Sequence, residues 1–257
     1  MCRLLAVITP KDQELSQTLG TSLQSFRSLS QVHCDGWGLA YWDSHNELVC
    51  HKRPESALHS ANFDEAVNGA HTDAALLHIR KASPQMSNEV ANTHPFVSGS
   101  VAFAHNGWLY PQQPLEDLAH AVHAPAPMGD TDSELFFDLI LAHLRNSEPV
   151  AALHAAIDSI RQSQVDYLSL NCMLLTDDSL YAVECWDPAA VERKGDPVDT
   201  FALRYLVQDD QALVASSGWD HDQSGWNTLG NGHVLQLHRG DLRSTIHRDL
   251  LQDGHQG

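Results

Sequence analysis

The sequence predicts an α+β fold in which two mainly antiparallel sheets stack face to face and helices cover their outer surfaces. Two observations support this prediction. Apolar segments of strand length alternate with amphipathic helical segments as far as residue 163. From Tyr167 onward, strand-length segments follow one another across short polar turns, which is typical of hairpins. Hairpins pair antiparallel, and helices with one apolar face need a sheet to cover.

The first part of the chain alternates strands and helices. The apolar run within residues 1–9 predicts a strand, and five apolar residues at helical spacing, from Leu15 to Leu29, predict an amphipathic helix over 11–30. Gly36 and Gly38 flank a tryptophan, which indicates backbone that passes close to another segment. Further strands are expected over 38–42, 47–52, 74–79 and 100–104, and further helices over 62–70, 115–123, 129–144 and 149–163.

The second part of the chain is predicted to consist of three hairpins. The expected strands lie at 167–176 with 180–186, 201–207 with 212–216, and 234–238 with 242–247. Each pair is joined by a turn rich in Asp, Gly, Ser or Gln. Because no internal repeat, low-complexity tract or long linker interrupts the chain, we expect a single domain over residues 2–250.

Composition excludes several classes of protein. Fifteen Lys and Arg residues against 33 Asp and Glu give a net charge of −18, which repels nucleic acid and anionic membranes. An anionic substrate would therefore need a local basic anchor. The sequence shows neither a signal-peptide core nor an apolar run long enough to span a membrane. The five cysteines are scattered and odd in number, so we expect a cytoplasmic protein with reduced thiols.

Cys2 follows the initiating methionine, at the head of the first apolar strand. If Met1 is removed, the thiol and a free α-amine share one carbon atom. A thiol of pKa about 8.5 is mostly protonated at pH 7, and an α-amine of pKa about 8 can accept its proton and create a nucleophile. The alternatives are that Cys2 is a small buried hydrophobe or that Cys34 is the nucleophile, although Cys34 has no evident activating partner.

Three other segments carry candidate functional residues, each with a structural alternative. Arg80 follows a buried strand and can bind a carboxylate with its planar guanidinium, or it can be a surface arginine paired with a nearby acid. Asn106-Gly107 can form a hairpin turn or stabilise an oxyanion. Asp132 can cap the helix that it begins or bind an ammonium group. The local pattern leaves each pair of alternatives open.

Histidine is abundant, with 17 residues, but its spacing does not predict a metal site. No H-E-x-x-H motif or paired C-x-x-C occurs. His71, His78, His94 and His105 lie in four different segments, so only folding could bring them together. We expect no functional metal.

The candidate segments, taken in order, resemble the class II glutamine amidotransferases, a branch of the N-terminal-nucleophile (Ntn) hydrolases. The resemblance covers roughly residues 2–240 and is densest over 2–134. It rests on Cys2 and five blocks: Asp35-Gly36-Trp37-Gly38, His78 to Ser83, Asn92-Thr93-His94-Pro95-Phe96, His105-Asn106-Gly107 and Gly129 to Glu134. The family fold is a four-layer α-β-β-α sandwich, in agreement with the predicted order of elements.

The resemblance implies a nucleophilic role for Cys2, with its own α-amine as the base. Asn106, through its side-chain amide, and Gly107, through its backbone N–H, would form the oxyanion hole. The reaction would cleave the γ-amide of glutamine through a γ-glutamyl thioester and release ammonia and glutamate. This chemistry requires neither a metal nor an organic cofactor.

The resemblance also implies how the substrate is held. Arg80 would bind the α-carboxylate of glutamine and Asp132 its α-ammonium group, while Ser83 and His94 fall at positions that line the glutamine pocket in related domains. Lys81 departs from the family, because the sugar-phosphate enzyme of the family has an aromatic residue there. The details of the pocket therefore differ from that enzyme.

The short, stand-alone members of the family match the chain better than the larger ones, so an ammonia-consuming synthase would be a separate partner. One alternative is a hydrolase of γ-glutamyl peptides or conjugates, distinguished by the pocket beyond the scissile bond, for which Trp37, Trp108, Trp219 and Trp226 are candidates. Another is a non-catalytic binding or regulatory protein, which predicts loss of a chemical residue. The sequence does not predict the oligomeric state.

Overall fold

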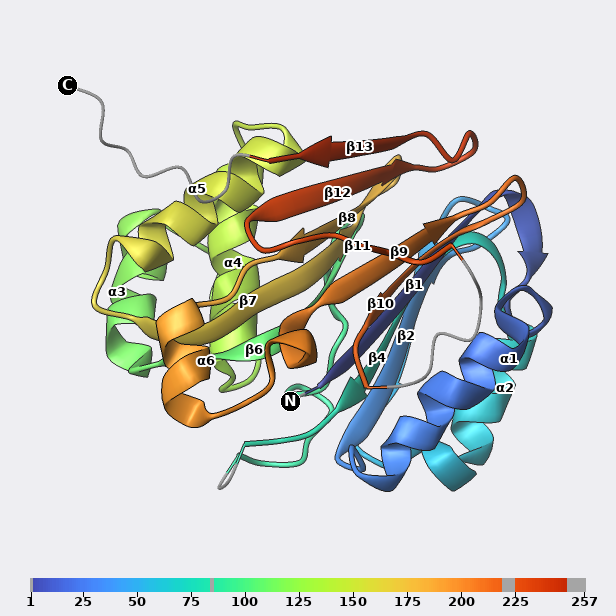
Figure 1. Ribbon diagram of the computed structural model, residues 1–257, viewed down its shortest axis with the longest axis horizontal. Helices are drawn as coiled ribbons and strands as arrows, with labels where there is room; N and C mark the ends of the chain where they lie inside the picture. The colour runs from blue at the N-terminus through green and yellow to red at the C-terminus, as the bar shows by residue number, and fades with distance from the viewer. Residues whose placement is uncertain (1, 84–85, 219–224, 249–257) are drawn as a thin grey trace.

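The computed structural model describes residues 2–83, 86–218 and 225–248, and these form four layers in the order helix, sheet, sheet, helix (Figure 1). Every strand pairing within the two sheets is antiparallel. The predicted α-β-β-α sandwich of two mainly antiparallel sheets, the Ntn-hydrolase fold, is therefore confirmed.

The first sheet is built around the N-terminal strand. In the described residues it has seven strands in the order β11-β9-β10-β1-β4-β2-β3. Residues Leu4 to Ile8 are buried on both faces because β1 lies in the middle of this sheet, between β10 and β4. The strands are β1 (Arg3–Glu14), β2 (Gly36–Trp42), β3 (Leu48–Arg53), β4 (His71–Arg80), β9 (Leu203–Val207), β10 (Ala212–Ser216) and β11 (Asn227–Thr228).

The second sheet contains the middle and the end of the chain. Its described part has six strands in the order β13-β12-β8-β7-β6-β5, in which the pairs β7–β8 and β12–β13 are two of the predicted hairpins. The strands are β5 (Phe96–Ser98), β6 (Val101–Tyr110), β7 (Asp166–Leu175), β8 (Ser179–Glu184), β12 (His233–His238) and β13 (Ser244–His247).

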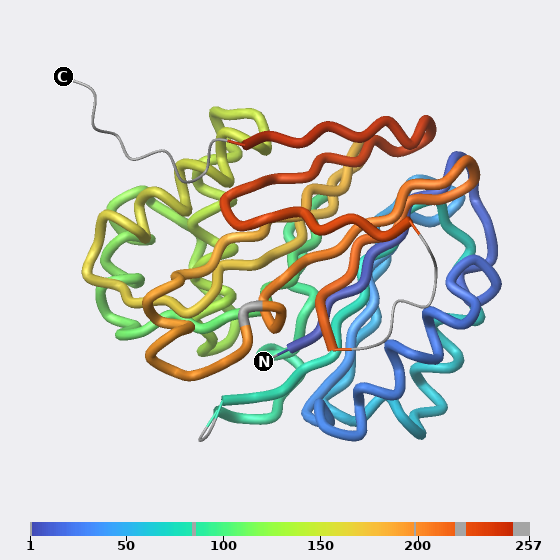
Figure 2. Tube along the Cα trace, viewed as in Figure 1, coloured from blue at the N-terminus to red at the C-terminus, as the bar shows by residue number. Residues whose placement is uncertain are grey.

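Helices cover the outer face of each sheet, as Figure 2 also shows along the Cα trace. Two helices pack on the first sheet and three on the second, and each turns its apolar face to the strands. A sixth helix, α6, follows β8. The helices are α1 (Leu15–Ser28), α2 (Ala61–Gly69), α3 (Gln112–Ala121), α4 (Asp132–Leu144), α5 (Pro149–Arg161) and α6 (Pro188–Lys194). None of the described helices is long and apolar enough to cross a membrane.

Three apolar cores separate the four layers. The central core lies between the sheets and contains alternate residues of β1 (Leu4, Ala6 and Ile8) and of β6 (Ala102 and Ala104). The intervening residues of each strand contribute to the two outer cores beneath the helices. The same alternation decides which polar residues at the strand ends project into the space between the sheets.

Two predicted elements are wrong in part. The first helix begins at Leu15 rather than near residue 11, because β1 continues past a register shift and pairs Gln13 and Glu14 with the start of β4. The hairpin turn considered for Asn106-Gly107 does not form, since β6 runs through both residues to Tyr110 and pairs with β7 throughout. The extension of β6 fixes the position of the Asn106 side chain.

Candidate active site

Cys2 lies immediately before β1, next to the end of β4. Arg3 pairs with Ile79, so Cys2 is one step further along the register, beside Arg80. Its Sγ atom accepts a hydrogen bond from the Lys81 N–H at 3.4 Å and lies 3.6 Å from the Lys81 carbonyl oxygen. The backbone after β4 therefore fixes the position of the half-buried thiol.

The surroundings of this thiol favour its protonated form. Burial raises the pKa of Cys2, and the charge of Asp132 raises it further. The hydrogen bond from Lys81 and the charge of Arg80 lower the same pKa, but burial is the larger effect. A nucleophilic Cys2 would therefore need a base to remove its proton.

Arg80 is the last residue of β4 and is 2% exposed. Its Nη1 donates to Asn88 Oδ1 at 2.9 Å, and its Nη2 donates to the carbonyl oxygen of Ser87 at 3.2 Å. Both acceptors are neutral, and no carboxylate among the described residues forms an ion pair with Arg80. The surface-arginine alternative is thus wrong, and the guanidinium keeps an uncompensated positive charge beside Cys2.

Sequence reasoning did not identify the residues that orient Arg80. Asn88 and Ser87 belong to an irregular segment, in which no periodic pattern indicates what a side chain contacts. Asp35 belongs to one of the blocks that resemble the family, and the sequence predicts no role for it alone. Its Oδ2 accepts from the Ala82 N–H at 2.8 Å, and its own N–H donates to the Arg80 carbonyl oxygen. Asp35 therefore fixes the backbone on which both Arg80 and Cys2 depend.

Asn106 and Gly107 lie side by side in β6, which packs against β1 and β4. Because Ala102 and Ala104 point between the sheets, Asn106 does too, toward the layer that contains Cys2. Asn106 is 1% exposed, and its Oδ1 has no hydrogen-bond partner among residues 2–83, 86–218 and 225–248. A buried amide oxygen without a partner is costly and is typical of a functional position.

Gly107 is required by close packing. A Cβ atom built there would lie 1.7 Å from the Ser169 carbonyl oxygen and 2.3 Å from His105 Nε2. Gly38 is similarly enclosed, because its Cβ atom would lie 2.0 Å from the carbonyl oxygen of His94. The close backbone approach that the sequence predicts around Trp37 is therefore confirmed at Gly38.

Asp132 is the first residue of α4, and its carboxylate contacts β6. Oδ2 accepts from the Leu109 N–H at 2.7 Å, and Oδ1 accepts from the Ser133 N–H at 2.8 Å. The helix cap itself is Thr131, whose Oγ1 accepts from the Glu134 N–H at 3.1 Å. Asp132 is therefore not the capping residue, and its charge acts on the thiol of Cys2.

His105 lies on the face of β6 that the helices cover, where its ring packs against Phe136 of α4. Its Nε2 donates to the Ser169 carbonyl oxygen at 3.0 Å, so its Nδ1 accepts from the Ser133 hydroxyl at 2.9 Å in the neutral form. Burial lowers the pKa of His105, against the opposing effect of Asp132. His105 thus links the start of α4 to β7 and leaves Asn106 to face the other way.

The two remaining candidates, Ser83 and His94, occupy different surroundings. Ser83 is exposed on the segment after β4, two residues beyond Lys81. His94 is 4% exposed and packs its ring 4.3 Å from that of His78 and 4.4 Å from that of Phe96. The structure therefore places His94 inside the sandwich and Ser83 at its surface.

Both imidazoles of the His78–His94 pair are neutral. Burial lowers the pKa of His78 to about 3 and that of His94 well below its ordinary value, and the charge of Arg80 lowers both. Among the described residues, neither ring nitrogen of His94 has a hydrogen-bond partner. These two nitrogens and Asn106 Oδ1 are buried polar atoms without a partner in the described part of the chain, and both residues belong to blocks that resemble the family.

The four tryptophans predicted as candidates to shape the pocket lie in different surroundings. Trp37 is 1% exposed and packs edge-on against Phe63, so it belongs to the core rather than to a pocket around Cys2. Trp108 is 40% exposed and stacks on Tyr110. Trp226 packs against the outer core of the first sheet, and Trp219 lies outside the described residues.

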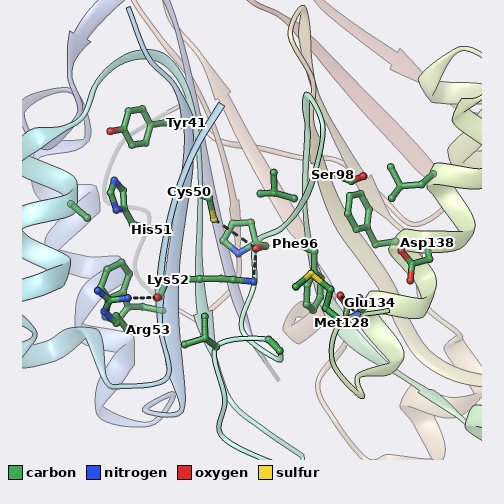
Figure 3. Close-up of a pocket in the computed structure, with 18 of the residues that line it drawn as sticks. Tyr41, Cys50, His51, Lys52, Arg53, Phe96, Ser98, Met128, Glu134 and Asp138 are labelled. Carbon is green, nitrogen blue, oxygen red and sulfur yellow. Dashed lines mark hydrogen bonds between the residues drawn. The ribbon is translucent and has the colours of Figure 1, made fainter. Parts of the chain in front are cut away.

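A groove of about 960 Å³ opens between the edge strands β3 and β5, away from these residues (Figure 3). Its lining includes none of Cys2, Arg80, Asn106 and Asp132. Lys52 in the groove donates to the carbonyl oxygens of Thr93 (2.8 Å) and Pro95 (3.3 Å).

Two charged residues of this groove, Lys52 and Glu134, form hydrogen bonds to backbone groups of neighbouring segments. Lys52 fixes the segment that carries His94, and Glu134, on the opposite wall, accepts from the N–H groups of Met128 and Gly129. The candidate active site is therefore the end of the sandwich at Cys2, where an opposed pair of charges accompanies a thiol.

Comparison with known proteins identifies the family of the chain. The sequence profile described as "Glutamine amidotransferases class-II" matches residues 1–256. An uncharacterized protein of Methanocaldococcus jannaschii is 31% identical over 191 residues, which are 71% of this chain and 50% of that protein. The chain spans about half the length of the curated relatives it matches.

Two solved structures share the fold. A glutamine aminotransferase class-II domain protein from Silicibacter pomeroyi has a TM-score of 0.68 at 19% identity, over 96% of this chain and 99% of that one. Glutamine phosphoribosylpyrophosphate amidotransferase from Bacillus subtilis has a TM-score of 0.67 at 17% identity, over 98% of this chain and 50% of that one. With the profile matching nearly every residue, the chain belongs to the class II glutamine amidotransferase family.

Proposed function

We propose that the protein is an N-terminal-cysteine amidohydrolase that cleaves the γ-amide of glutamine or of a γ-glutamyl amide through a γ-glutamyl thioester. One observation carries the proposal: the Lys81 backbone fixes the Cys2 thiol beside Arg80, and the opposite charges of Arg80 and Asp132 both act on it. The head of an amino acid carries the complementary pair of charges. This arrangement suits a substrate with a free α-carboxylate and a free α-ammonium group.

Arg80 binds the α-carboxylate of the substrate in this proposal, and Asp132 binds the α-ammonium group. Arg80 is pre-oriented because Asn88 and Ser87 hold its guanidinium, and Asp132 because two backbone N–H groups hold its carboxylate. Pre-orientation lowers the entropic cost of binding. Simple amides lack both charges and would bind poorly.

The reaction begins with proton transfer from the Cys2 thiol to its own α-amine, after removal of Met1, which lies outside the described residues. The thiolate attacks the side-chain amide carbon, and the oxyanion forms against the Asn106 amide and the Gly107 N–H. The C–N bond then breaks, and the α-ammonium group protonates the departing ammonia or amine. Water hydrolyses the thioester, which releases glutamate and restores the thiol.

Ser83 and His94 have supporting roles in this proposal. Ser83 stands at the surface close to the Lys81 backbone, where it can contact bound substrate. His94 is a neutral ring inside the sandwich and shapes the base of the pocket together with His78. Ammonia released from glutamine would serve a separate synthase, whereas a γ-glutamyl peptide would release an amine instead.

Glutamate release from glutamine tests the proposal, with Met1 removal first verified by intact mass. We expect release by wild type, loss of it in Cys2→Ala, and retention in Cys34→Ala, which removes the exposed rival thiol. Equal release by wild type and Cys2→Ala would contradict the proposal. No release from any γ-glutamyl compound by the processed protein would favour the non-catalytic alternative.

A further inference from the structure

The groove between β3 and β5 contains a carboxyl group without a partner. Asp138, in the middle of α4, lines this groove and is 5% exposed. Its Oδ2 atom makes no hydrogen bond, and Asp138 forms no ion pair, among residues 2–83, 86–218 and 225–248. A carboxyl group that has lost its water without gaining a donor is costly to the fold.

Glu134 is the second carboxylate on this wall of the groove, one helical turn before Asp138. Unlike Asp138, it has its own donors: its Oε1 accepts from the Met128 N–H at 3.0 Å and its Oε2 from the Gly129 N–H at 2.7 Å. Burial, reinforced by the charge of Glu134, raises the pKa of Asp138 to about 7. A cation that enters the groove would therefore meet two acidic groups, of which one lacks a donor, and would favour the ionised form of Asp138.

The basic side chains of the groove lie on the opposite wall and are directed elsewhere (Figure 3). Lys52 Nζ donates to the carbonyl oxygens of Thr93 and Pro95 and lies 5.3 Å from the centre of the Phe96 ring. Arg53 Nη1 donates to the carbonyl oxygen of Lys52 at 3.4 Å. In the described part of the groove, the positive charge that would complement Asp138 is therefore not supplied by the protein.

The remaining surface of the groove suits an apolar molecule. Its volume of about 960 Å³ is within the range of small-molecule sites. Three large apolar side chains that line it are exposed: Val90, Val97 and Met128. The thioether of methionine also makes favourable contacts with aromatic rings. A ligand with an apolar body and one charged end would cover these side chains and place its charge at Asp138.

We infer that this groove is a binding site for an organic cation, a primary amine on an aromatic or aliphatic body, held through the carboxylate of Asp138. An ammonium group donates to a carboxylate through strong, charge-assisted hydrogen bonds. The net charge of −18 also attracts cations to the protein. The lining of the groove includes none of Cys2, Arg80, Asn106 and Asp132, so this second site does not depend on the proposed function.

Isothermal titration calorimetry with phenethylamine and 2-phenylethanol tests the inference. The two probes share an aromatic body and differ in the ammonium group, which the alcohol replaces with a neutral hydroxyl. At about pH 8, where Asp138 is mostly ionised, we expect wild type to bind the amine more tightly, and Asp138→Asn to weaken amine binding about 20-fold and spare the alcohol. Asp117→Asn removes an exposed carboxylate of α3 outside the groove and is the matched control, which should bind like wild type. Val97→Lys adds a cation to the β5 wall and should weaken amine binding more than alcohol binding.

Three results would overturn the inference: no binding of phenethylamine, equal affinity for the amine and the alcohol, or amine affinity unchanged in Asp138→Asn. Asp132→Asn distinguishes the groove from the candidate active site, where Asp132 is proposed to bind an ammonium group. This variant should bind phenethylamine like wild type, and loss of binding would place the amine beside Cys2 and overturn the inference. Should Asp138→Asn not fold, amine affinity unchanged in Val97→Lys would overturn it equally well. None of these results bears on glutamate release, so the proposed function is tested separately.

Discussion

Substituting Gly107 with alanine tests whether β6 and β7 are as tightly joined at the site as the structure indicates. The added Cβ atom would lie 1.7 Å from the Ser169 carbonyl oxygen and 2.3 Å from His105 Nε2. Both neighbours are fixed, since the His105 ring donates to that same oxygen at 3.0 Å. Relief of the clash requires a shift of more than an ångström between two central strands. Overpacking of this kind typically costs 1–3 kcal/mol, and the backbone contact here places the expected loss at about 3 kcal/mol or more.

Urea unfolding, followed by circular dichroism, measures this loss. Gly69→Ala is the matched control, because nothing lies within 4 Å of a Cβ atom at the end of α2. Alanine is the better helix former, so the control should be unchanged or stabilised by up to about 1 kcal/mol. A Gly107→Ala protein as stable as the control would refute the account of why glycine occupies this position.

Three further predictions concern Arg80, its partner Asn88 and the carboxyl group of Asp138. Arg80→Met should raise KM for glutamine about 100-fold through loss of the two-donor contact with the α-carboxylate; an unchanged KM in steady-state assays would contradict that role. Asn88→Ala should raise KM by a smaller factor with kcat retained, because it removes the contact at Nη1 and spares the one from Nη2 to Ser87; a lower kcat at constant KM would place Asn88 elsewhere in the mechanism. Burial, reinforced by Glu134, raises the pKa of Asp138 from 3.8 to about 7, so the folded state holds this proton more tightly than the unfolded chain. The stability that Asp138 contributes is therefore complete below about pH 4 and lost as the pH rises through 7. Asp138→Asn does not lose this stability at high pH, so its urea midpoint relative to that of wild type should be higher at pH 8 than at pH 4. A midpoint difference between variant and wild type that is the same at both pH values would contradict the pKa shift of Asp138.

The arrangement of layers could be predicted because local pattern and global packing agree. Apolar runs of strand length became central strands such as β1 and β4, and the turns rich in Asp and Gly became hairpins. Proximity of Cys2 and Arg80 also follows from sequence once the strands beginning at Cys2 and ending at Arg80 pair antiparallel. The remaining candidate site residues were predicted from the sequence blocks that resemble the family and from their order along the chain.

The rest depends on contacts that no local pattern encodes. Asn106-Gly107 has the composition of a turn, but β6 pairs along its whole length with β7, and that pairing overrides the local preference. Asn88 and Ser87 orient Arg80 from an irregular segment.

The central claim is that the thiol of Cys2 carries the γ-glutamyl group during the reaction. Mass spectrometry of acid-quenched enzyme, processed at Met1 and mixed with a γ-glutamyl substrate, measures this directly. The account predicts a γ-glutamyl adduct on the peptide that begins with Cys2, formed and discharged as glutamate appears, and absent from Cys2→Ala. Glutamate release with an adduct on another residue, or with none while Cys2→Ala remains active, would contradict it.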